Sequence, residues 1–179
     1  MKPRDILFNH YEKGSRLTDI LVRHSEVVRD KALAVCERVP HLKPDKSFVA
    51  EAAMVHDIGI YQTHTPKIGC HGRHPYIRHG VIGRQLLEQY GYKAHALVCE
   101  RHVGVGLTMV DIEDRQLPLP RRDMLPTTIE EIIICYADKF FSKTRGVEPH
   151  PLEKVVTGLE RYGPDKVERF MQWHNLLAG

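Results

Sequence analysis

Apolar residues in this chain recur with a helical period, and no segment alternates apolar and polar residues as a half-buried strand would. In residues 16–39, Leu21, Val28 and Val35 fall on one helical face, and His24 lies in the same row. Prolines and glycines separate seven segments of this kind. The pattern therefore predicts an all-α protein, a compact bundle of about seven helices.

The expected helices cover roughly residues 16–39, 47–57, 76–90, 93–103, 127–143, 151–163 and 164–178. Ser47 is expected to cap the second helix, and Thr127 or Thr128 the fifth, because their hydroxyls can accept a free N–H of the first turn. Residues 60–75 are expected to form a loop. Residues 104–126, which are rich in glycine and proline, are expected to be irregular.

The composition is that of an ordinary globular domain, with 42% apolar and 27% charged residues in a chain of 179. The apolar runs are too short to cross a membrane, and the first residues lack the pattern of a signal peptide, so we expect a cytoplasmic protein. A net charge of +3 would suit an anionic substrate. The chain shows no basic stripe or aromatic platform, which argues against nucleic-acid binding.

Four side chains of metal-ligand type fall on apolar helical faces: His24, His56, Asp57 and Asp138. For each histidine alone, a hydrogen-bonded core residue is the alternative. Asp138 directly follows the apolar run "IIICYA", and a buried carboxylate requires a cation or several donors. Asp57 is expected near a helix C-terminus, where a negative charge is disfavoured. A bound cation would remove both penalties.

Two further histidines extend this set. His79 lies one turn before Gly83, and His102 lies at a predicted helix end, as His56 does. Six ligands are too many for one zinc ion but suit two cations bridged by a carboxylate. Imidazole and carboxylate ligands are compatible with Fe, Mn, Co, Ni or Zn, so the sequence leaves the metal open.

The order of these residues resembles the HD-domain superfamily of metal-dependent phosphohydrolases, and "HDIG" at 56–59 is similar to its HDIG branch. The segments "ERHVGVGLT" and "LPRRDMLPTTIEEIIICYADK" also resemble a group of small uncharacterised HDIG proteins. The resemblance covers roughly residues 20–145. It implies a single HD domain over 1–179, with a core at about 16–145 and a C-terminal helical extension at about 150–178.

By this resemblance, four residues would bind a first metal: His24, His56, Asp57 and Asp138. His79 and His102 would complete a second metal site, with Asp57 as the bridging, catalytic residue. Two such ions lower the pKa of a shared water, and the resulting hydroxide attacks phosphorus. We expect the substrate to be a small phosphorylated molecule such as a nucleotide, with its phosphates held by Lys139 and Arg145. His64 would also bind the substrate, either as a donor to the leaving group or at the entrance.

Other functions are compatible with the same residues. Ile60 stands where a lysine often follows HDxG, which argues against a cyclic-dinucleotide substrate. An HD-type di-iron oxygenase would need the same six ligands. A mononuclear nucleotidase or a non-catalytic module that binds metal or nucleotide is a further alternative. The C-terminal helix pair either closes the bundle or forms the face of a homodimer.

Overall fold

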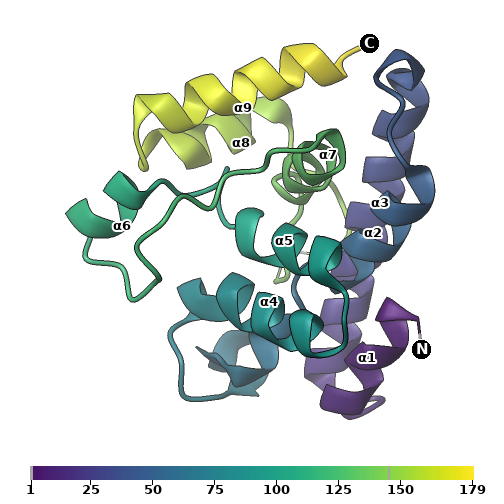
Figure 1. The fold of residues 1–179 in the computed structure, drawn as a ribbon, viewed down its shortest axis with the longest axis vertical. Helices are drawn as coiled ribbons and strands as arrows, with labels where there is room; N and C mark the ends of the chain where they lie inside the picture. The colour runs from purple at the N-terminus through teal and green to yellow at the C-terminus, as the bar shows by residue number, and fades with distance from the viewer. Residues whose placement is uncertain (1, 145) are drawn as a thin grey trace.

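The computed structural model describes residues 2–144 and 146–179, and these are helical or irregular apart from one short hairpin (Figure 1). The helices are α1 (Pro3–His10), α2 (Arg16–Arg38), α3 (Lys46–Val55), α4 (His79–Gln89), α5 (Lys93–Arg101), α6 (Met109–Asp114), α7 (Ile129–Asp138), α8 (Leu152–Glu160) and α9 (Pro164–Leu177). Strands β1 (His64–Thr65) and β2 (Cys70–His71) are antiparallel. Four 3₁₀ turns connect these elements: η1 (Pro40–Leu42), η2 (Ile58–Gln62), η3 (Pro66–Ile68) and η4 (Tyr76–Arg78).

The all-α prediction is confirmed, but the described ranges contain nine α-helices rather than about seven. The first additional helix, α1, buries Ile6 and Leu7. The second, α6, lies in the segment that was expected to be irregular. Its first turn is a capping box, in which Thr108 and Asp111 each accept the other's backbone N–H. The six-residue helix is too short for apolar periodicity to reveal it.

Two helix boundaries also differ from the expectation: the start of α3, and the end of α7, which lies at Asp138 rather than at about residue 143. The Asp45 carboxylate, and not Ser47, accepts the Phe48 N–H, so α3 begins slightly earlier than expected. At α7 the Thr128 hydroxyl accepts the Glu131 N–H, which confirms one of the two predicted caps. The loop expected at 60–75 contains the β1–β2 hairpin and η3.

Two clusters of buried apolar residues fill the bundle. The larger joins α2, α3, α7, α8 and α9 and includes Ile134 and Phe170. The smaller joins α1, α4, α5 and η2 and includes Ile58 and Leu87. In Figure 1, α8 and α9 lie at one end of the molecule and α1 and α4 toward the other. The chain passes between the clusters where α3 ends and η2 begins, at His56 and Asp57.

The C-terminal helix pair closes one side of the larger cluster. Phe170, Trp173 and Leu177 of α9 are buried there, and the Phe170 ring stacks on Tyr136 of α7 with ring centroids 5.3 Å apart. The apolar face of α9 is therefore covered within the chain. A homodimer remains a prediction.

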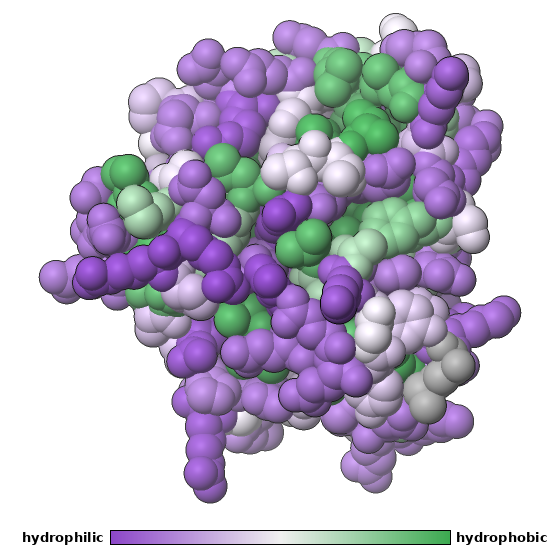
Figure 2. Space-filling view, viewed as in Figure 1, coloured by the Kyte–Doolittle hydropathy of each residue, from purple (hydrophilic) through white to green (hydrophobic). Residues whose placement is uncertain are grey.

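The outer surface is mostly hydrophilic in the view of Figure 2, with separate hydrophobic patches. One patch lies over α6, where Met109 and Val110 are exposed. Within the described ranges, no helix is both long enough and apolar enough to cross a membrane.

Glycines allow the helices around η2 to pack backbone against backbone. A Cβ at Gly59 would lie 2.1 Å from the carbonyl oxygen of His79, and a Cβ at Gly80 would lie 2.6 Å from that of Cys99. Such distances are far below van der Waals contact, so only glycine fits at these two positions. The first contact brings α4 against η2, and the second brings α5 against α4.

We therefore expect Gly59→Ala to lower the free energy of unfolding by about 2–4 kcal/mol, because the methyl group must displace backbone atoms of α4. Gly158→Ala in α8 is the matched control, since a Cβ there meets no atom within 4 Å. The control should raise stability by up to about 1 kcal/mol through helix propensity. Urea unfolding measures both. Equal stability of the two variants would contradict the packing described.

Candidate metal centre

The structure brings together all six of the ligand-type residues singled out in the sequence, and each is buried. They come from five separate segments of the chain. They are His24 on α2, His56 and Asp57 between α3 and η2, His79 at the start of α4, His102 directly after α5, and Asp138 at the end of α7.

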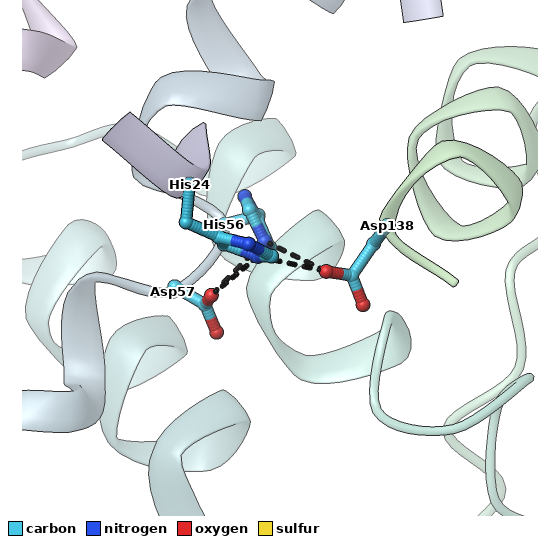
Figure 3. A group of neighbouring side chains, drawn as sticks. All are labelled: His24, His56, Asp57 and Asp138. Carbon is cyan, nitrogen blue, oxygen red and sulfur yellow. Dashed lines mark hydrogen bonds and ion pairs between the residues drawn. The ribbon is translucent and has the colours of Figure 1, made fainter. Parts of the chain in front are cut away.

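The first group contains His24, His56, Asp57 and Asp138 (Figure 3). The Nε2 atom of His24 lies 2.9 Å from Asp138 Oδ1 and 3.3 Å from Asp57 Oδ2. The Nε2 atom of His56 lies 3.1 Å from the same Asp57 oxygen and 3.5 Å from Asp138 Oδ1. One ligand atom from each residue lies within 4.8 Å of the other three, so these residues could hold one metal ion.

The second group contains Asp57, His79 and His102. Asp57 Oδ1 lies 3.3 Å from the Nε2 atoms of both histidines, and those two nitrogens are 3.1 Å apart. Asp57 is thus shared: its Oδ2 atom faces the first group and its Oδ1 atom faces the second. This is the arrangement that a carboxylate bridge between two ions requires.

Three of the histidines are oriented by the same local contact. The Nδ1 atoms of His56, His79 and His102 lie 2.7, 2.7 and 2.8 Å from the carbonyl oxygens three residues earlier, which belong to Ala53, Tyr76 and Cys99. A carbonyl only accepts hydrogen bonds, so each Nδ1 carries a proton and donates it. In the neutral ring the lone pair then lies on Nε2, which faces Asp57 and is available to a metal.

Charge in the centre is balanced by two partly buried lysines. The Lys143 ammonium lies 2.6 Å from Asp57 Oδ2, and that of Lys139 lies 2.8 Å from Asp138 Oδ2. Burial alone would raise the pKa of both carboxyl groups. Lys143 and His56 nevertheless hold the pKa of Asp57 well below its usual value, and Lys139 does so for Asp138. Both carboxylates are therefore ionised at neutral pH.

The histidines differ in protonation. Burial lowers the pKa of His79 to about 3, so its ring is neutral at pH 7. Burial also disfavours charge on His56, but Asp57 and Asp138 outweigh this effect and raise its pKa to about 9. A proton on His56 thus contributes positive charge in the metal-free protein. A metal ion would take the place of that proton.

The donor set fits a divalent transition metal. Within residues 2–144 and 146–179, His56 Nε2 and both oxygens of Asp57 are buried without a well-directed hydrogen bond, although they lie in ion-pair contact with neighbouring groups. Buried polar atoms normally have such a partner. Imidazole nitrogens and carboxylate oxygens that converge in this way are ligands for Fe, Mn, Co, Ni or Zn.

The structure places the three expected substrate-binding residues differently. Lys139 lies at the centre, in contact with Asp138. His64 is exposed in β1 and belongs to neither ligand group. Arg145 lies outside the described residues. Lys143, which was not among the residues expected to bind the substrate, contacts Asp57 directly. It follows the end of α7 by five residues, where helical periodicity no longer indicates which way a side chain points.

The chain is 35% identical over 138 residues to an uncharacterized protein of Methanocaldococcus jannaschii, covering 76% of this chain and 71% of that protein. It is also similar to two proteins named tRNA (cytidine(56)-2′-O)-methyltransferase. The one from Thermoplasma volcanium is 28% identical over 94% of this chain and 44% of its own length. The one from Picrophilus torridus is 31% identical over 74% of this chain and 35% of its own length.

The chain thus spans less than half the length of either methyltransferase. No solved structure matches it. The family model described as HD domain matches residues 9–142, a range that contains all six residues of the two ligand groups. The chain therefore belongs to the HD-domain superfamily of metal-dependent phosphohydrolases.

Proposed function

We propose that this protein is a metal-dependent phosphohydrolase that uses two divalent transition-metal ions to cleave a small phosphorylated substrate such as a nucleotide. The observation that carries the proposal is the position of Asp57, whose two oxygens face two different histidine groups. His24, His56 and Asp138 would complete one site, and His79 and His102 the other. Asp57 would bridge them and is the catalytic residue.

The bound ions would supply Lewis acidity and a water of lowered pKa. The protein's own residues supply the remaining requirements. The carbonyl contacts of His56, His79 and His102 fix their rings before any ligand binds, so no reorganisation is needed. Lys139 and Lys143 place two ammonium groups beside the carboxylates, where they can attract and hold the substrate's phosphate.

Lys139 and Lys143 favour a phosphohydrolase over the alternative functions. A di-iron oxygenase would use the same six ligands, but it has no requirement for two ammonium groups at the centre. A non-catalytic module would have no requirement for ligand groups on both sides of Asp57. Methyl transfer, named for two relatives, is not carried over, because this chain spans less than half of each.

Asp57→Asn is expected to reduce phosphate release by at least about 100-fold, because the bridging charge is lost while the shape of the side chain is kept. The assay uses p-nitrophenyl phosphate and bis-p-nitrophenyl phosphate with Mn²⁺, Fe²⁺, Co²⁺ or Ni²⁺. Asp30→Asn is the control, since Asp30 is exposed and pairs with Arg29. Undiminished phosphate release in Asp57→Asn would refute the proposal. Oxygen consumption with an organic substrate, without phosphate release, would favour the oxygenase.

Metal analysis of protein purified anaerobically should find two equivalents per chain. His79→Ala should retain about one, because it removes a ligand from the second group only. His41→Ala, at an exposed histidine in η1, should retain two. A single equivalent in the unmodified protein would support the mononuclear alternative instead.

A further inference from the structure

A cleft of about 540 Å³ opens beside the metal centre, between the first half of α2, η3 and the segment that follows α7. Four cationic side chains line it: Arg16 and Arg23 of α2, Lys67 of η3, and Lys143. Asp19 is the one acidic residue among the described residues of its lining. The cleft is therefore strongly positive, although the whole chain carries a net charge of only +3.

Lys143 connects this cleft with the metal centre. Its side chain lines the cleft, while its ammonium group lies 2.6 Å from Asp57 Oδ2. Arg23, which also lines the cleft, directly precedes His24 in α2. A molecule with one end at the two ligand groups would thus extend into the cleft past Lys143.

Three of the four cations in the cleft are not paired with a carboxylate of the described residues, and the exception is Lys143. Within the described ranges, Arg16, Arg23 and Lys67 form no ion pair with a carboxylate, whereas Arg29 on the same helix lies 2.7 Å from Asp30. The Arg16 guanidinium donates a hydrogen bond to the Lys67 carbonyl oxygen at 3.2 Å, which joins α2 to η3. Like charges held around one cleft repel each other, and a bound anion would relieve that repulsion.

The spacing of these cations exceeds the size of one phosphate. Arg16 and Arg23 are seven residues apart, so they share a face of α2 and lie about 10 Å apart along its axis. One phosphate at the metal centre would reach Lys143 but not Arg16. The row of cations leads away from the centre and would contact a group further along the substrate.

We infer that the cleft binds a second phosphate group of the substrate, while the first lies at the metal centre. This inference rests on the proposed phosphohydrolase function and narrows its substrate class to small molecules with two phosphate groups at separate positions. Arg16, Arg23 and Lys67 then determine specificity, and Lys143 lies between the two phosphates.

The test compares the binding of pentylphosphonate and pentane-1,5-diyl bisphosphonate to the metal-loaded protein by calorimetry. The two probes differ only in the second phosphonate, and their P–C bonds resist hydrolysis. We expect the bisphosphonate to bind at least about tenfold more tightly, since even one charge-assisted hydrogen bond would give that factor. The double variant Arg16→Gln/Arg23→Gln should abolish this preference, and Lys67→Gln, on another element, should reduce it. Arg29→Gln should retain it.

Equal affinity of the unmodified protein for both probes would overturn the inference, as would a preference that persists in Arg16→Gln/Arg23→Gln. All four substituted residues are at least partly exposed, so the variants should fold, and their melting temperatures verify this. Because binding is read without turnover, the preference holds or fails independently of whether phosphate release is observed.

Discussion

The structure depends on the burial of a single carboxylate, that of Asp57. The side chain has no access to solvent, and an ionised group in that position is costly unless it is paired. Four histidine rings and the Lys143 ammonium, contributed by five other positions along the chain, surround it. The segments that carry these groups are also the segments that build the two apolar clusters. The same segments therefore pair the Asp57 carboxylate and pack the bundle.

Local geometry orients the side chains around Asp57, and tertiary packing brings them together. Each of three histidines is oriented by a carbonyl three residues earlier, a contact made within its own turn. The rings meet only because α4 and α5 approach η2 closely enough, and Gly59 and Gly80 make that approach possible. The "HDIG" segment thus contributes to the centre in two ways. It provides two ligand-type side chains, and its glycine allows α4 to pack closely.

Positive charge extends from the centre in one direction. Lys139 and Lys143 balance the carboxylates of the metal-free protein, and Lys143 is shared with a cleft whose other cations have no acidic partner. Inside the centre, opposite charges are paired. In the cleft, Arg16, Arg23 and Lys67 have no acidic partner among the described residues. Paired charges are typical of a structural ion-pair network, and unpaired cations are typical of a surface that binds an anionic ligand.

Periodicity in the sequence was sufficient to predict the helical class and four ligand-type residues, because a polar side chain on an apolar helical face is detectable from the pattern alone. His79 and His102 were predicted from other local features, a glycine one turn later and a helix end. The position of Asp57 between the two groups was implied only by the resemblance to the HD-domain superfamily. The sequence did not reveal α6, which is too short to show a period, or the contact of Lys143 with Asp57 beyond the end of α7. The cleft was equally hidden, since Arg16 and Lys67 are 51 positions apart in the chain. Only tertiary packing decides whether cations so far apart in sequence face the same space, because no local rule relates their positions.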